Sequence, residues 1–275
     1  MKEFGDKVAV ITGAASGIGF GLAQRCAQEG MKVVLADINQ EDLQAAEQAL
    51  APSGATTLAV QTDVSKFEEV EALGQKTLDA FGAVHILVNN AGVAAGDAVW
   101  EATLADWQWV MGVNLWGVIY GAKVFVPIML GQDTECHIVN TASVAGLAPY
   151  MSCSPYQVTK HAVVALSENL HYSLEQANAR IKISVLCPGW VRTRILDSGR
   201  NRPPELQNDL ANEPAAMEDE ASEEQARQAV ETGMAPEEVA DRVVRAIREE
   251  RFWILTHSDY DAEIRARFEG ILGGS

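Results

Sequence analysis

Two side chains that could move a proton lie four residues apart in the stretch SPYQVTKHAV, which runs from Ser154 to Val163. In a helix this spacing places Tyr156 and Lys160 on one face. A phenol titrates at about pH 10 and is a poor base at neutral pH, but a neighbouring ammonium favours the phenolate. Taken alone, the pair could equally be a weak contact on a surface helix. Its meaning depends on what else the chain brings to it.

A glycine-rich turn near the N-terminus indicates a phosphate site. The stretch VAVITGAASGIGFGLAQRCAQEG begins as a strand, passes the turn and continues as a helix. Glycine lets the backbone approach a phosphate closely, and the helix offers free N–H groups and the positive end of its dipole. A dinucleotide site is therefore expected here, although a tight turn without a ligand remains the alternative. The residues expected to line it are Gly13, Ser16, Gly17, Ile18 and Gly19.

Asp37 ends the next predicted strand, about 20 residues after the glycines, where a carboxylate can bind an adenosine ribose and repel a 2′-phosphate. No Arg or Lys stands in the glycine turn, and Ile38 and Asn39 follow Asp37. These residues favour NAD over NADP. A helix N-cap is the alternative role for Asp37. Asp63, followed by Val64 at the end of the third predicted strand, could meet the adenine amino group or cap the next helix.

The elements that must position these residues alternate along the chain. Short apolar runs, several rich in β-branched residues, predict buried strands. They are KVAVIT, KVVLAD, TTLAVQTD, VHILVNNAG, HIVNTAS, IKISVLCPG and RFWILTH. Amphipathic stretches between them predict helices, among them 17–29, 41–50, 67–81, 156–176 and 236–250. The alternation predicts an α/β fold in one domain over residues 1–275, with a doubly wound, mainly parallel seven-stranded sheet and helices on both faces.

The segment 197–233 departs from this alternation. It is rich in acidic residues, contains prolines and has no strand pattern. An insertion of this length in a compact domain predicts a mobile, partly helical lid over a site, with solvated surface decoration as the alternative. Acidic residues beside a pocket would disfavour strongly anionic substrates.

Composition excludes several classes of function. The formal net charge of −17 gives the chain no general attraction for nucleic acid or anionic membranes. The N-terminus shows no apolar signal region, and no later run is expected to be long enough to span a bilayer. The four cysteines form no C-x-x-C pair, so we expect no metal site and reduced thiols in a cytoplasmic protein. They are Cys26, Cys136, Cys153 and Cys187.

Six motifs in order give the chain a family resemblance. They are TGAASGIG (12–19), NNAG (89–92), Asn114 in VNLWG, Ser143 in NTASVAG, YQVTK (156–160) and PGWVRT (188–193). Singly some are weak, but together the chain resembles the short-chain dehydrogenase/reductase family over nearly all its length. Only the insertion at 197–233 and the end of the chain lie outside the resemblance, which implies a Rossmann-type fold.

The resemblance implies a catalytic set of Asn114, Ser143, Tyr156 and Lys160. Tyr156 would exchange a proton with the reacting oxygen, and Ser143 would orient that oxygen. Lys160 would lower the pKa of Tyr156 and also bond the nicotinamide ribose, while Asn114 would hold a water that links Lys160 to solvent. The hydride would pass between a substrate carbon and the nicotinamide ring.

The resemblance also implies binding residues after three of the strands. Expected cofactor contacts are Asn90, Ala91, Gly92, Tyr156, Lys160, Pro188, Gly189, Val191 and Thr193. Thr193 would bond the carboxamide, or serve as a turn residue. Expected substrate contacts are Ser143, Val144, Ala145, Tyr156, Trp190 and Leu196, with further wall positions at 94–96 and 150–153. Because this wall is mostly apolar, a small hydrophobic secondary alcohol or its ketone is the expected substrate. The tryptophans around residues 100–116 are expected to serve core or subunit contacts rather than a ligand.

The leading hypothesis is an NAD-dependent alcohol dehydrogenase or carbonyl reductase that assembles as a homotetramer, a dimer of dimers, as the resemblance implies. An NADPH-dependent reductase, for instance of 3-oxoacyl thioesters, is the alternative that Asp37 disfavours. A non-catalytic dinucleotide-sensing regulator is a more remote alternative, because such a protein would usually lose Tyr156 or Lys160.

Overall fold

The computed structural model describes residues 1–148, 153–208 and 220–274. Its strands form one sheet in the order β3-β2-β1-β4-β5-β6-β7, and each neighbouring pair is parallel. The strands are β1 (Val8–Thr12), β2 (Lys32–Asp37), β3 (Thr57–Gln61), β4 (Ile86–Asn89), β5 (Cys136–Thr141), β6 (Ile181–Cys187) and β7 (Trp253–Leu255). The strand order reverses between β1 and β4, and sheets of this kind bind ligands at that point. The predicted doubly wound sheet is confirmed.

The strands are continuously apolar because both of their faces are covered. Along β1, Val8 and Val10 join the hydrophobic cluster on one face, while Ala9 and Ile11 join the cluster on the other. Successive side chains of a strand point to opposite faces, so a strand buried on both sides needs apolar residues at every position.

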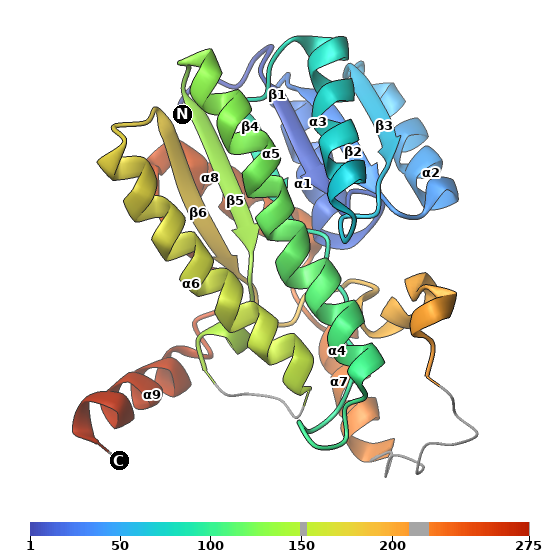
Figure 1. Cartoon of the computed structure of the whole chain (residues 1–275), viewed down its shortest axis with the longest axis vertical. Coiled ribbons are helices and arrows are strands. Elements are labelled where there is room, and N and C mark those ends of the chain that lie inside the picture. The colour runs from blue at the N-terminus through green and yellow to red at the C-terminus, as the bar shows by residue number, and fades with distance from the viewer. Residues whose placement is uncertain (149–152, 209–219, 275) are drawn as a thin grey trace.

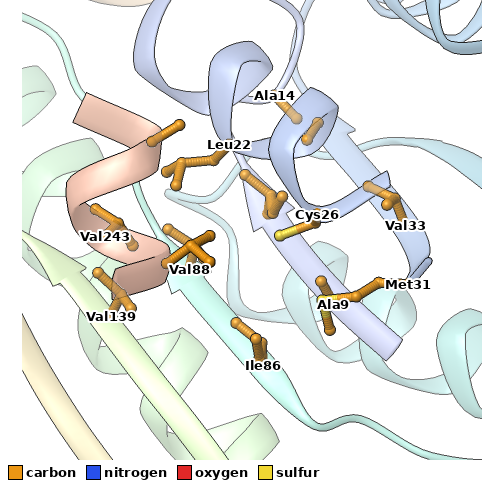
Figure 2. Close-up of a cluster of buried hydrophobic side chains, with 14 of the residues drawn as sticks. Ala9, Ala14, Leu22, Cys26, Met31, Val33, Ile86, Val88, Val139 and Val243 are labelled. Atoms are coloured by element: carbon orange, nitrogen blue, oxygen red, sulfur yellow. The ribbon is translucent and has the colours of Figure 1, made fainter. Parts of the chain in front are cut away.

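Two layers of helices cover the sheet (Figure 1). The α-helices are α1 (Gly17–Gln28), α2 (Gln40–Leu50), α3 (Phe67–Phe81), α4 (Leu104–Met111), α5 (Gly117–Gln132), α6 (Ser154–Gln176), α7 (Glu220–Glu231), α8 (Pro236–Glu249) and α9 (Asp261–Gly273). Helices α1, α2 and α8 supply the apolar residues of one cluster, and α3, α5 and α6 supply those of the other. Figure 2 shows Leu22 and Cys26 of α1 and Val243 of α8 above Ala9 and Val88 of the sheet.

One long helix corrects an expectation. Helix α4 continues through a π-helical turn (Gly112–Trp116) into α5, so that Leu104–Gln132 is a single helix of 29 residues with a mean hydropathy of 1.5 in its most apolar window. By length and composition it could cross a membrane, so the expectation that no run is long enough is wrong. Part of its apolar surface belongs to the core: Phe125 and Met129 are buried between the sheet and α3.

The predicted insertion at 197–233 is partly helical. After β6 the chain makes two 3-10 turns (Ile195–Asn201 and Pro204–Leu206), and it enters α7 at Glu220. Residues 209–219 lie outside the described residues. Figure 1 shows the described parts beyond the carboxyl ends of the strands, on the side of the sheet where α4 begins.

Candidate active site

A cavity of about 580 Å³ opens at the carboxyl edge of the sheet. Its walls come from the glycine turn, the ends of β2, β4, β5 and β6, helix α6 and the 3-10 turns after β6. The predicted nucleotide residues on the wall are Gly13, Ser16, Gly17, Ile18, Asp37, Ile38, Asp63, Val64, Asn90, Ala91, Gly92, Pro188, Gly189, Val191 and Thr193. The predicted chemical residues on it are Ser143, Val144, Ala145, Tyr156, Lys160, Trp190 and Leu196. Two predicted residues, Gly19 and Asn114, do not line it.

The glycine turn is shaped by close packing. Gly13 adopts a left-handed conformation with φ of 64° as the chain leaves β1. A β carbon on Gly19 would lie 2.0 Å from the carbonyl oxygen of Gly13, so this glycine lets α1 pack onto the turn rather than contact a ligand. Ser16 precedes α1 in an extended conformation, and its side chain makes no capping hydrogen bond. The N-terminus of α1 therefore meets the cavity as an anion site that fits a pyrophosphate.

Asp37 presents a partly buried carboxylate to the ribose end of the cavity. Its Oδ2 accepts a hydrogen bond from the Ala15 N–H at 3.1 Å, and its Oδ1 accepts one from the Asn39 N–H at 3.0 Å. Burial raises the pKa of Asp37, and these two backbone bonds oppose the rise. The N-cap alternative is wrong, because Asn39 caps α2 by accepting from the N–H groups of Glu41 and Asp42. The placement fits an acceptor for ribose hydroxyls.

Asp63 holds the turn before α3. Its Oδ1 accepts from both the backbone N–H (3.0 Å) and the hydroxyl (2.7 Å) of Ser65, and its Oδ2 lies 3.3 Å from Lys66 Nζ. Of its two predicted roles, stabilising the start of the helix is the one with hydrogen bonds in this structure. The side chain also lines the cavity.

The NNAG segment supports the floor of the cavity. The Thr12 hydroxyl accepts from the backbone N–H groups of Asn90 (2.9 Å) and Ala91 (3.0 Å), and the Asn90 side chain donates to the Thr12 carbonyl at 3.0 Å. At the end of β4, the side-chain amide of Asn89 donates to Oδ1 of Asn140 in β5 at 2.8 Å. These bonds join the ends of β1, β4 and β5 beside the cavity.

Tyr156 and Lys160 stand in the first two turns of α6, opposite Ser143 at the end of β5. Lys160 Nζ donates to the carbonyl of Thr141 at 3.0 Å and lies 5.4 Å from the centroid of the Tyr156 ring. The Ser143 hydroxyl accepts from the Ala145 N–H at 3.1 Å and lies 3.4 Å from the carbonyl of Pro188. A phenol, an ammonium and a hydroxyl thus meet at one end of a cavity whose other end is the glycine turn.

Burial changes the titration of both basic groups. It raises the pKa of Tyr156 to about 12, against the opposing effect of a hydrogen bond with Ser143. It also lowers the pKa of Lys160, which is 3% exposed, to about 8. In the protein without its cofactor, burial therefore sets the pKa of Tyr156, and the lowering expected from Lys160 together with the nicotinamide ring stays a prediction. Desolvation of the phenolate outweighs an ammonium that points to the Thr141 carbonyl and faces the ring.

Asn114 fixes the loop after β4. Its side-chain oxygen accepts from the Val93 N–H at 2.8 Å, and its NH₂ donates to the Val93 carbonyl at 2.9 Å and to Thr159 Oγ1 at 3.2 Å. It lies in the π-helical turn, a feature often found at functional sites. The side chain is therefore occupied by protein partners, and a water held by Asn114 stays a prediction.

The segment after β6 is joined to α4 by an arginine whose side chain is 9% exposed. Arg202 Nη1 lies 2.7 Å from Asp106 Oδ1, Arg202 Nη2 donates to Asn208 Oδ1 at 2.7 Å, and the guanidinium lies 5.1 Å from the centroid of the Trp109 ring. Through this contact Leu206 and the buried Trp109 pack beside Tyr156 and line the cavity. The sequence pattern did not predict that Leu206 and Trp109 line the cavity, because this depends on the contact between Arg202 and Asp106. These two residues are 96 positions apart, and no local spacing joins them.

The tryptophans predicted to serve core or subunit contacts lie partly in the cavity wall and partly on the surface. Trp109 is a cavity residue as well as a core residue, whereas Trp100 is 81% exposed. Of the further wall positions predicted, 150–152 lie outside the described residues, Ala94 and Cys153 line the cavity, and Ala95 and Gly96 do not. In the parts of the chain that the structure describes, no group of three or more His, Cys, Asp or Glu side chains could hold a metal ion.

A parallel sheet with a switch point, a glycine turn before α1 and an acid ending β2 define a Rossmann-type dinucleotide-binding protein. A family model described as short chain dehydrogenase matches residues 7–203. The chain belongs to the short-chain dehydrogenase/reductase family of oxidoreductases, which use a nicotinamide dinucleotide.

Relatives and solved structures agree with this assignment. The chain is 35% identical to a CLA biosynthesis dehydrogenase/reductase of Lactiplantibacillus plantarum, over 99% of this chain and 95% of that protein. It is 30% identical to a C alpha-dehydrogenase of Sphingobium sp., over 99% of this chain and 87% of that protein. A short chain dehydrogenase/reductase from Burkholderia phymatum, crystallised in complex with NAD, is 46% identical, with a TM-score of 0.95 and coverage of 98% of this chain and 96% of that one.

Proposed function

We propose that the protein is an NAD(H)-dependent oxidoreductase that interconverts a hydrophobic secondary alcohol and its ketone, with Tyr156 as the acid and base. The observation that carries the proposal is the shared cavity: Ser143, Tyr156 and Lys160 line the same space as the glycine turn and Asp37. A site that only sensed the dinucleotide would not need a phenol, an ammonium and a hydroxyl beside it.

Each residue has a definite task in this proposal. Ser143 donates a hydrogen bond to the reacting oxygen and orients it. Tyr156, protonated at neutral pH with a pKa of about 12 in the protein alone, gives its proton to the oxygen of the ketone, and in the other direction takes the proton of the alcohol. Lys160 supplies a donor beside the ring. The bound cofactor supplies or accepts the hydride, and its positive charge in the oxidised state favours the phenolate.

The walls beyond Tyr156 favour a hydrophobic, uncharged substrate. Val93, Val144, Trp109 and Leu206 line this part of the cavity. Acidic residues act on this wall: burial raises the pKa of Cys153, which lines the cavity, to about 11, and the charges of Asp97 and Asp106 add to the rise. A carboxylate bound there would meet the same repulsion. A ketone with an aliphatic or aromatic substituent fits this wall better than an organic acid.

A panel of secondary alcohols with NAD, followed by the absorbance of NADH, tests the proposal. We expect turnover of neutral hydrophobic alcohols, and slower turnover of carboxylate-bearing analogues of equal size. Higher catalytic efficiency with NADP than with NAD would favour the NADPH-dependent reductase instead. Tight NADH binding without turnover of any alcohol or ketone would favour the dinucleotide-sensing regulator.

We propose further that the protein works in the cytoplasm as a homotetramer, without nucleic acid or membrane partners. Support comes from apolar side chains left exposed on the outer helices: Leu130 of α5 is 47% exposed, and Val158 and Tyr172 of α6 are 47% and 61% exposed. None of the residues of α9 is buried. Size-exclusion chromatography with light scattering should give about four times the 29.7 kDa chain mass. A monomer at micromolar concentration would contradict the assembly.

A further inference from the structure

Two arginines reach the ribose end of the cavity from a part of the chain far from the nucleotide motifs. Arg194 and Arg200 line the cavity together with Asp37, Ile38 and Asp42. Both belong to the segment after β6, which passes close to the glycine turn: a β carbon on Gly17 would lie 3.0 Å from the methyl carbon of Thr193. The adenosine end of the site thus has an acidic wall from β2 and α2 and a basic wall from this segment.

Arg194 is already paired across this part of the cavity. Its Nη1 lies 2.9 Å from Oδ2 of Asp42, which sits in the first turn of α2. The Arg194 side chain is 47% exposed and that of Asp42 is 33% exposed. An exposed pair of this kind contributes little to stability, so Arg194 can exchange Asp42 for a competing anion at small cost.

Arg200 is held by its backbone neighbours beside the same acids. Its Nη1 donates to the carbonyls of Asp197 (2.8 Å) and Arg194 (3.1 Å), which fixes the 3-10 turn that carries it. Its positive charge opposes the rise in the pKa of Asp37. Two guanidinium groups therefore lie together at the ribose end of the site, although the chain as a whole has a net charge of −17.

We propose that Arg194 and Arg200 form a cationic site for a ribose 2′-phosphate, and that Asp37 and Asp42 hold this site in check. The proposal rests on the proposed use of NAD and concerns how NAD is preferred to NADP. Guanidinium groups bind phosphate with two parallel hydrogen bonds. Asp37 repels that phosphate, and Asp42 occupies Arg194. The preference for NAD then results from a balance between the acidic wall and the basic wall. The glycine turn and the residues directly after Asp37 indicate a simpler cause, namely that no cation lies near the 2′-phosphate.

Calorimetric binding of 2′,5′-ADP and 5′-ADP to the cofactor-free full chain tests the balance, because these probes differ in the 2′-phosphate. Asp37→Ser should raise the affinity for 2′,5′-ADP at least tenfold and change that for 5′-ADP much less. Asp37→Asn, which keeps one oxygen for the backbone donors, gives the same comparison if the serine variant unfolds. In either background, R194Q/R200Q should remove the gain. The matched control R192Q/R265Q removes two charges that do not line the cavity and should retain it.

Asp42 gives an independent arm. Asp42→Asn releases Arg194 and should tighten 2′,5′-ADP binding several-fold, and the gain should vanish when R194Q is added. The proposal is overturned if neither Asp37 variant gains affinity for 2′,5′-ADP, or if the gain survives loss of both arginines. These outcomes are separate from the proposed activity, because no alcohol is present. NADH binding without alcohol turnover would count against the oxidoreductase proposal alone.

Discussion

Replacing Tyr156 with Phe is expected to lower kcat for alcohol oxidation and ketone reduction by at least about 10³-fold, within the range for loss of a general acid or base. The change removes one oxygen from a ring that packs beside Val93, Trp109 and Leu206, so the fold and the shape of the wall should survive. NADH affinity, followed by fluorescence, should change by less than about threefold, because the glycine turn and Asp37 are untouched.

The matched control for this variant is Tyr172→Phe, which removes the same oxygen from a ring on the same helix that does not line the cavity. It should turn over at the rate of the parent. Near-normal turnover of Tyr156→Phe would remove the acid–base assignment, whatever its effect on stability. A loss of NADH binding equal to the loss of turnover would instead make Tyr156 a cofactor ligand, because an interaction present only in the transition state leaves ground-state binding unchanged.

The parts of this site that the sequence predicts are those encoded locally. The glycine turn is a strand, a turn and a helix in succession, and the spacing of Tyr156 and Lys160 is set by one helical turn. The apolar runs predicted the strands because both faces of the sheet are buried. Helix 67–81 was predicted with the bounds that α3 has, because its amphipathic pattern is local. In the structure Gly82 ends this helix in a left-handed conformation.

The parts that the sequence did not predict depend on residues far apart in the chain. Arg202 and Asp106 meet across 96 positions and Arg194 and Asp42 across 152, so no spacing rule joins them. The rise in the pKa of Tyr156 that burial causes in the cofactor-free protein was not predicted, because neighbour charge can be read from a helical spacing but the extent of burial cannot. Asn39, not Asp37, is the N-cap of α2. Asn and Asp are about equally good N-caps, so residue type alone does not distinguish the two positions, and the backbone geometry decides which one caps the helix.

At Lys160, stability and function are expected to change in opposite directions. Replacing it with Met should stabilise the cofactor-free protein by about 1–2 kcal/mol at pH 7, and at the same time weaken NADH binding and lower turnover. Burial lowers the pKa of Lys160 to about 8, against about 10.4 in an unfolded chain. Holding the ammonium in this site therefore costs about 3 kcal/mol at pH 7, at 1.36 kcal/mol per pKa unit. Loss of the bond to Thr141 offsets about 1–2 kcal/mol of the gain.

The sign of the pH dependence follows from proton counts. Between about pH 8 and pH 10.4 the unfolded chain binds more protons at this lysine than the folded chain does, so the free energy of unfolding of the parent gains up to about 3 kcal/mol as the pH rises through that window. Below pH 8 both states carry the proton, and the full cost remains. The Met variant lacks this contribution. Its advantage at pH 7 should therefore shrink and reverse by about pH 10, where the parent keeps a neutral amine bonded to Thr141.

Urea unfolding at pH 7 and pH 10, at one protein concentration so that assembly does not shift the midpoints, measures this difference. Lys182→Met is the matched control, because Lys182 is exposed on β6. The difference in unfolding free energy between this variant and the parent should be the same at both pH values. A Met variant at position 160 that is less stable than the parent at pH 7 would show that the lysine is a structural anchor whose bond to Thr141 outweighs its desolvation. A more stable variant with weaker NADH binding would show that the fold bears the cost of a buried ammonium because the cofactor and Tyr156 require one at that place.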